Sequence, residues 1–207
     1  MKAKPLHRAT ALILGLFILT HLAVHLFALG GIEAHLKALD AVQWIYRNPL
    51  GETLLVIAIL TQIVTGLKRL KAKRKNKTFW AKAQVLSGLY LMGFLIIHTG
   101  AAIFTHSVFG LETDFYWAAG SMNISPIKFF FWPYYFFAVL SFFVHFACAL
   151  HFGWPGKFGR VKKTLPWLGG LIALTIILTF TGAFYDVPVT EDVLNYYRKN
   201  FGILGVE

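Results

Sequence analysis

The residues of this chain best suited to chemistry are its 8 histidines, since it has a single cysteine and 9 acidic residues. Cys148 lies inside an apolar run, so neither an intrachain disulfide nor a cysteine-based metal cluster is expected. Two histidines, His21 and His98, lie near the middle of long apolar segments. An ionisable side chain in hydrocarbon is costly and normally has a partner or a function. Because neutral imidazole binds metals, these two residues are the first candidates for a cofactor site.

Five apolar segments must position these histidines. The chain is 57% hydrophobic and 14% charged, whereas a soluble domain is about 45–50% apolar and about 25% charged, so an ordinary soluble globule is excluded. A bilayer core about 30 Å thick needs about 20 helical residues to cross it. The segments of suitable length are 9–29, 51–67, 84–107, 130–152 and 165–184. We expect an all-α membrane protein whose five transmembrane helices form one domain, 1–184, followed by a short extracytoplasmic tail, 185–207.

The basic residues predict the orientation of these helices. Of the 20 Lys and Arg residues, 15 lie in the N-terminal tail, in the tract Lys68–Lys82 or between Lys157 and Lys163, and the 9 acidic residues all lie elsewhere. Because segments rich in Lys and Arg stay in the cytoplasm, we predict a multi-pass protein of the inner (cytoplasmic) membrane with its N-terminus inside and its C-terminus outside. The net charge of +11 then indicates contact with lipid and not with nucleic acid. The tract Lys68–Lys82 is either a topogenic loop or a docking surface for an acidic partner.

An internal repeat relates the first four helices. When the first helix is laid onto the third at one constant offset, small, aromatic and histidine positions coincide, and the pairs are Thr10 with Ser87, Phe17 with Phe94 and His21 with His98. The second helix, laid onto the fourth in the same manner, gives the pairs Gln62 with His145, Gly66 with Ala149 and Leu67 with Leu150. Such matches at a fixed spacing indicate a duplicated unit. Two helical hairpins and a fifth helix are therefore expected.

Helix geometry sets the depth of the polar residues. At a rise of about 1.5 Å per residue, His21 and His98 lie level, about 18–21 Å from the cytoplasmic side, and Gln62 and His145 lie at about 8–13 Å. Facing imidazoles suit the two axial positions of a b-type haem, while zinc needs further ligands. We expect one haem b between His21 and His98. At the inner level His145 faces an amide, so that site is either filled by side chains or holds a second, five-coordinate haem.

The motifs also resemble those of a known family. The unit His7–Ala11, followed by Phe17 and His21, is similar to one family motif, and Gln84–Gly88, followed by His98, resembles the related Q-R-x-[ST]-G unit. The pattern H-x-x-x-G-[IL] matches Gln62–Leu67 and His145–Leu150. Over residues 6–184 the chain resembles the cytochrome b membrane-anchor subunit of succinate dehydrogenase and fumarate reductase, in its single-chain, five-helix, dihaem form.

This resemblance implies a role in electron transport. It implies that His21 and His98 bind the distal haem and that His145 binds the proximal one, with Gln62 at the position of the second proximal ligand and Val85 in place of the arginine. Electrons would pass between a cytoplasmic flavoprotein and iron–sulfur subunit and membrane quinone, as in the tricarboxylic acid cycle or in fumarate reduction. The chain has no flavin-binding glycine fingerprint and no cysteine set for an iron–sulfur cluster, so alone it cannot oxidise succinate.

Further residues are candidates for positions around the haems. His25 and His106 could contact outer haem propionates or quinone, or meet lipid headgroups. Lys68, Arg69 and His151 could pair with inner propionates, or snorkel to the interface. Arg8 and Ser87, from the two motif units, complete the candidate cofactor-binding set with Gln62. Small residues could admit a porphyrin or simply pack helices, and they are Ala11, Gly15, Gly66, Ser87, Gly88 and Ala149.

The remaining polar residues leave other functions open. Glu52, at the outer start of the second helix, could accept protons from a quinol, or could be a solvated helix N-terminal acid. His7 and His35 are expected to be solvated. No acidic residue lies deep in a span, which disfavours a transporter or channel. A stand-alone haem-binding or structural membrane protein without a dehydrogenase partner is the alternative function.

Overall fold

A computed structural model describes residues 3–73 and 78–206, and these residues form an all-α fold. Five of its helices are long and apolar enough to cross a membrane. They are α1 (Ala3–Phe27), α3 (Pro49–Lys73), α4 (Phe79–Phe109), α6 (Lys128–Gly153) and α7 (Gly159–Phe180). The predicted fold class is confirmed, and the five helices indicate a multi-pass membrane protein.

The surface of the long helices is apolar, as a lipid-facing surface must be. In the most apolar window of each span, between 6% and 33% of the residues are buried. Large side chains such as Leu12, Leu86 and Trp167 are 76%, 72% and 82% exposed, respectively. Apolar area on this scale is not left in water by a monomeric soluble protein. The fold therefore buries it in lipid.

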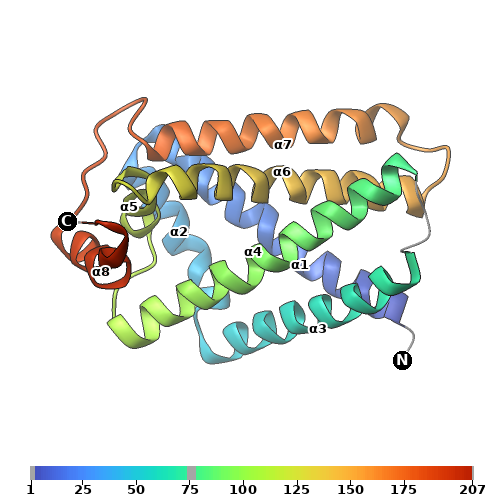
Figure 1. Ribbon diagram of the computed structural model, residues 1–207, viewed down its shortest axis with the longest axis horizontal. Helices are drawn as coiled ribbons and strands as arrows, with labels where there is room; N and C mark the ends of the chain where they lie inside the picture. Colours follow the sequence, from blue (N-terminus) through green and yellow to red (C-terminus); the bar gives the residue numbers. More distant parts are fainter. Residues whose placement is uncertain (1–2, 74–77, 207) are drawn as a thin grey trace.

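The long helices pack as two hairpins and a fifth helix (Figure 1). α1 lies along α3, α4 lies along α6, and α7 packs against α6. The two chain ends lie at opposite ends of the bundle (Figure 1). We call these the N-terminal end and the C-terminal end of the bundle.

Shorter helices cover the C-terminal end, where the sequence pattern predicts loops and a tail. They are α2 (Ile32–Tyr46), α5 (Phe115–Asn123) and α8 (Glu191–Phe201), with 3-10 turns at Ala28–Gly30 and Gly202–Leu204. The described part of the tail, residues 185–206, thus contains a helix that packs on the rest of the fold. α8 packs on α5 so closely that a Cβ at Gly120 would lie 2.4 Å from Val193, and Tyr197 donates a 2.9 Å hydrogen bond to the Trp117 carbonyl. The charges at its two ends interact favourably with the helix dipole, since Glu191 lies in the first turn and Lys199 in the last.

The fifth membrane helix differs from its predicted bounds. It covers Gly159–Phe180 and not 165–184. The helix ends early because Gly182 adopts a left-handed conformation with φ +83°, which turns the chain out of the helix. The Tyr185 hydroxyl then donates a 2.7 Å hydrogen bond to the Ala28 carbonyl. This bond ties the segment after α7 to the end of α1.

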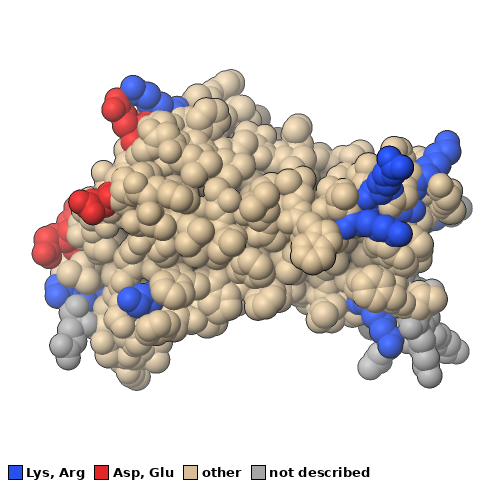
Figure 2. All heavy atoms as spheres, turned by 90° about the horizontal axis from the view of Figure 1, so that it is seen from above, with Lys and Arg blue, Asp and Glu red and all other residues tan. Residues whose placement is uncertain are grey.

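Charged residues gather at the two ends of the molecule and leave a wide uncharged band between them (Figure 2). One end shows Lys and Arg, and the other shows Asp and Glu together with some Lys and Arg (Figure 2). Such a band is the surface that a hydrocarbon core requires. The side chains of residues 71–77, in the middle of the tract Lys68–Lys82, lie outside the described residues.

Candidate functional site

A cavity of about 260 Å³ lies in the half of the bundle nearer the C-terminal end, and we call it the C-end cavity. Its walls come from both hairpins, from α7 and from the short helices α2 and α5. The histidines that line it are His21, His25, His35, His98 and His106. Glu52, from the start of α3, also lines this cavity. The C-end cavity therefore collects most of the residues that the sequence pattern assigns to the outer haem.

The two histidines predicted to lie level do lie side by side. The ring centroids of His21 and His98 are 6.2 Å apart. Each ring stacks on a phenylalanine four residues earlier on its own helix, His21 on Phe17 at 5.7 Å and His98 on Phe94 at 4.9 Å. The same pair of residues thus adopts the same arrangement in both repeats. The repeat seen in the sequence is therefore also present in the packing of these side chains.

This spacing fits a metal held between two imidazoles. With metal–nitrogen bonds of about 2 Å, two imidazoles on opposite sides of one metal have ring centroids about 6 Å apart. His21 Nε2 also lies 3.1 Å from His25 Nε2. A metal at that nitrogen would take the place of this hydrogen bond. The centroid distance of the pair is therefore compatible with two imidazoles on one metal.

A chain of imidazoles leads from this pair toward the end of the bundle. His25 Nδ1 lies 3.1 Å from His35 Nε2. His35 is 1% exposed and contacts the edges of Phe115 and Phe180, so the expectation that it is solvated is wrong. It is buried because the supposed loop is helix α2, which folds over the cavity. Burial, together with the nearby His21, lowers the pKa of His35 to about 4. Its Nδ1 has no hydrogen-bond partner among the described residues.

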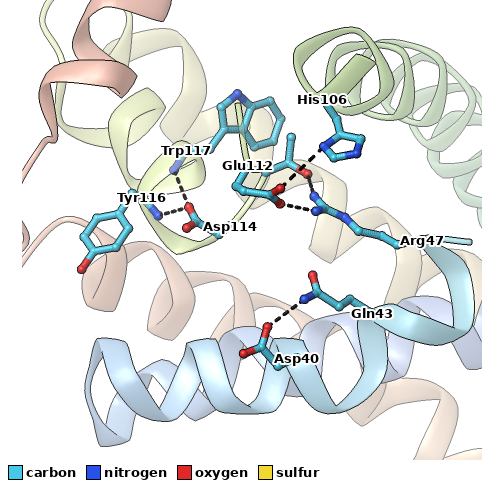
Figure 3. Close-up of polar contacts among 9 residues, drawn as sticks. Asp40, Gln43, Arg47, His106, Glu112, Asp114, Tyr116 and Trp117 are labelled. Atoms are coloured by element: carbon cyan, nitrogen blue, oxygen red, sulfur yellow. Dashed lines mark hydrogen bonds and ion pairs between the residues drawn. The ribbon is translucent and has the colours of Figure 1, made fainter. Parts of the chain in front are cut away.

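Polar contacts join residues at the wall of the C-end cavity near the chain segment 106–117 (Figure 3). Arg47, just after α2, donates hydrogen bonds to Glu112 and Thr113. The exposed His106 lies 4.0 Å from Glu112 and not deep among the other histidines. Asp114 caps α5 by accepting hydrogen bonds from the backbone of Tyr116 and Trp117. Burial raises the pKa of the Asp114 carboxyl, although these backbone bonds oppose the shift.

A second cavity, of about 410 Å³, lies nearer the N-terminal end between the two hairpins, and we call it the N-end cavity. Gln62 and His145, which were predicted to share a level, both line it. Five of the six small residues singled out from the sequence line it too, and they are Ala11, Gly15, Gly66, Gly88 and Ala149. The sixth, Ser87, is not among the described lining residues. Val85 lies in its wall where the resemblance implies an arginine. These small residues thus line a cavity, in addition to lying where helices pack together.

His7 also lines the N-end cavity, contrary to the expectation that it is solvated. Its Nδ1 lies 2.9 Å from the Thr65 hydroxyl, and its Nε2 lies 3.4 Å from Gln62 Nε2. Thr10 in turn donates a 2.5 Å hydrogen bond to Gln62 Oε1. Helix α1 begins at Ala3, well before the predicted start at residue 9. These six additional helical residues place His7 against α3.

The remaining candidates lie around the N-end cavity in different ways. Ser87 lies 3.2 Å from His145 Nδ1, and Arg69 lines the cavity. Lys68 and Arg8 are exposed and are not among the lining residues. His151 stacks on Trp80 with ring centroids 4.5 Å apart, also away from the cavity lining. Of the cations proposed for the inner propionates, the structure places Arg69 alone among the described lining residues.

In the part of the chain that the structure describes, no group of three or more His, Cys, Asp or Glu side chains could hold a metal ion. Comparison with protein families, curated proteins and solved structures found no match to this chain. The geometry of the two cavities is therefore the basis for assigning a function.

Proposed function

We propose that this chain is a haem b protein and the membrane-anchor, electron-transfer subunit of a succinate:quinone oxidoreductase, that is, of a succinate dehydrogenase or fumarate reductase. The observation that carries the proposal is the pairing of His21 and His98, with ring centroids 6.2 Å apart. The two residues come from repeat-related helices that cross the membrane. Bis-imidazole ligation between neighbouring helices is typical of b-type haem.

Several residues in and beside the C-end cavity would have a part in this function. His21 and His98 would hold the haem, which when bound supplies a one-electron carrier. His25 would donate a hydrogen bond to the outer haem propionates or to quinone. Glu52, which lines the same cavity, would take the protons of a quinol at this end. The ion pair of Arg47 with Glu112 joins the end of α2 to the segment before α5, which also lines the cavity.

The partners would approach from the N-terminal end. Exposed basic residues there include Lys4, Arg8, Lys68 and Lys82, and this end would face the cytoplasm by the positive-inside rule. The flavoprotein and iron–sulfur subunits would dock on that side, and quinone would enter from the lipid of the cytoplasmic membrane. Gln62 and Val85 depart from the pattern of the resembling family, and these departures favour a stand-alone haem-binding protein as the second candidate function.

A spectrum of the purified full chain tests the haem assignment. We expect the reduced chain to give a low-spin b-type spectrum. His21→Ala and His98→Ala should each lower the number of low-spin haems by one per chain. Thr20→Ala is a matched control, since Thr20 is exposed, adjoins His21 and is absent from the described linings of both cavities. A protein without haem would overturn the proposal. Flavin and iron–sulfur subunits that co-purify with the chain would distinguish the oxidoreductase anchor from the stand-alone protein.

A further inference from the structure

The imidazoles of the N-end cavity are held in the same way on two different helices. His7 rests on the dipeptide Thr65–Gly66 of α3, and His145 rests on the dipeptide Ser87–Gly88 of α4. The distance from His7 Nδ1 to the Thr65 hydroxyl is 2.9 Å, and that from His145 Nδ1 to the Ser87 hydroxyl is 3.2 Å. A hydroxyl residue followed by glycine therefore forms a seat for each ring.

These contacts select one tautomer for both rings. A serine or threonine hydroxyl has one proton to donate, and here Thr65 donates it to the Thr61 carbonyl at 2.7 Å. Ser87 likewise donates its proton to the Ala83 carbonyl at 2.7 Å. Each hydroxyl must then accept from the imidazole, so Nδ1 has the proton and Nε2 has the lone pair. A hydrogen bond at Nδ1 that leaves Nε2 for the metal is the usual arrangement of a ligating histidine.

The glycine of each seat makes room for the ring. A Cβ added at Gly66 would lie 3.5 Å from His7 Cε1, and one added at Gly88 would lie 3.0 Å from His145 Cε1. The second distance is shorter than ordinary van der Waals contact. A larger residue at Gly88 would move His145 away from Ser87. These glycines thus position imidazoles, which is a more specific task than bringing two helices together.

The repeat shows that each hairpin supplies one imidazole and one amide to this cavity. The offset that pairs His21 with His98 also pairs His7 in α1 with Gln84 in α4, and Gln62 in α3 corresponds to His145 in α6. All four residues line the N-end cavity. Relative to the second hairpin, the first hairpin has its histidine on the other helix. The imidazole that the first hairpin supplies to this cavity is therefore His7, and Gln62 supplies the amide.

We propose that His7 and His145 are the axial ligands of a second haem b, bound in the N-end cavity. This inference rests on the proposed function, because it takes haem as the carrier at both levels. It assigns the sixth ligand to α1, whereas the family resemblance implies the position of Gln62 in α3. The Gln62 amide lies 3.4 Å from His7 Nε2 in this structure, and it would lose this contact if that nitrogen bound the metal.

The number of low-spin haems per chain tests this assignment. The full chain is produced in haem-sufficient cells, its total haem is measured as the pyridine haemochrome, and low-spin ferric haem is counted by electron paramagnetic resonance. We expect two low-spin haems in the unaltered chain and one in His7→Gln and in His145→Gln. Lys4→Gln, an exposed position on the same helix, should retain both. The haem of His21 and His98 that remains in His7→Gln shows that this variant folds.

A double variant tests the position of the ligand independently. Gln62→His added to His7→Gln returns an imidazole to the same wall of the cavity, and we expect it to restore the second low-spin haem. A single low-spin haem in the unaltered chain that His7→Gln leaves unchanged would overturn the inference while the proposed function stands. A haem that depends on His7 and His145 but not on His21 would support the inference and overturn the assignment of the C-end pair. A chain without haem would refute both.

Discussion

At the scale of single residues, burial decides the charge of His35. Folding lowers its pKa from the ordinary value of 6.5 to about 4, so between these values the unfolded chain binds a proton that the folded chain does not. The stability that neutral His35 contributes is complete above pH 6.5 and is lost as the pH falls toward 4. The α2 cover over the C-end cavity is therefore expected to weaken in acid.

Thermal unfolding of the detergent-solubilised chain between pH 7 and pH 4 measures this effect. We expect the melting temperature to fall across the range, and to fall less steeply in His35→Gln, whose side chain does not titrate. Lys37→Gln, an exposed position on the same helix, is the control and should keep the slope of the unaltered chain. Equal slopes in His35→Gln and in the unaltered chain would contradict the prediction.

Glu52 is the residue that tests quinone chemistry. If its carboxylate accepts quinol protons in the C-end cavity, Glu52→Gln should lower quinone-linked turnover of the assembled complex by about 100-fold, the lower end of the usual contribution of a general base. Glu33→Gln removes an exposed carboxylate that pairs with Lys37, and it should leave turnover unchanged. If Glu52→Gln has the same turnover as the unaltered complex, Glu52 is only a helix N-terminal acid and not the proton acceptor.

Single residues differ in how far the sequence predicts them. His21 and His98 could be found because they lie inside long apolar segments at repeat-related positions, and depth follows directly from helix rise. His7 and His35 were misjudged because both lie near the ends of apolar runs, where solvent exposure depends on neighbouring helices. A usable signal for His7 was the pair of hydroxyl–glycine dipeptides, Thr65–Gly66 and Ser87–Gly88, which occur on helices at the same level.

At the scale of helices, the contact between α6 and α7 depends on Gly169. A Cβ at this position would lie 2.7 Å from Phe143 Cβ and 2.8 Å from two of its ring atoms. Phe143 is 4% exposed, and its Cβ cannot move without its backbone. We expect Gly169→Ala to destabilise the chain by about 1–3 kcal/mol, as is usual for an overpacked core.

The neighbouring Gly170 provides a matched control. Nothing lies within 4 Å of a Cβ at Gly170, and alanine has the higher helix propensity. Gly170→Ala should therefore retain or slightly raise the melting temperature in detergent, while Gly169→Ala lowers it. The same melting temperature for both variants would mean that α6 and α7 can separate without cost.

The membrane helices could be predicted from the sequence because length and hydrophobicity alone define them. The short helices α2, α5 and α8 could not be predicted in this way, since the expected topology requires only that α2 and α5 lie in segments that connect spans and that α8 follows the last span. Contacts far apart in the sequence stabilise them instead. Tyr196 accepts a 2.7 Å hydrogen bond from Thr105, for example, and Gly120 lets α8 approach α5. The buried residues of α8, Val193, Tyr196 and Tyr197, do recur at helical spacing, but this segment was predicted from the sequence only as a short extracytoplasmic tail.

At the scale of the whole molecule, the charges of Figure 2 predict the direction of insertion. The positive-inside rule places the N-terminal end in the cytoplasm. Alkaline phosphatase fused to the C-terminus should be active, and the same enzyme fused near Lys75, which lies outside the described residues, should be inactive. The reverse pattern of activities would show the opposite orientation and would place partner docking at the other end.

Helix α1 contributes a histidine to each cavity, His7 at one level and His21 at the other. Their separation along the sequence corresponds to about 21 Å along the helix, which is about two-thirds of a hydrocarbon core about 30 Å thick. A charge transferred between the two levels moves through that fraction of the membrane voltage, and a full crossing costs or yields about 2.3 kcal/mol per 100 mV. If both proposed haems are bound, electron transfer between them would be electrogenic, and the membrane voltage would favour one direction of transfer over the other.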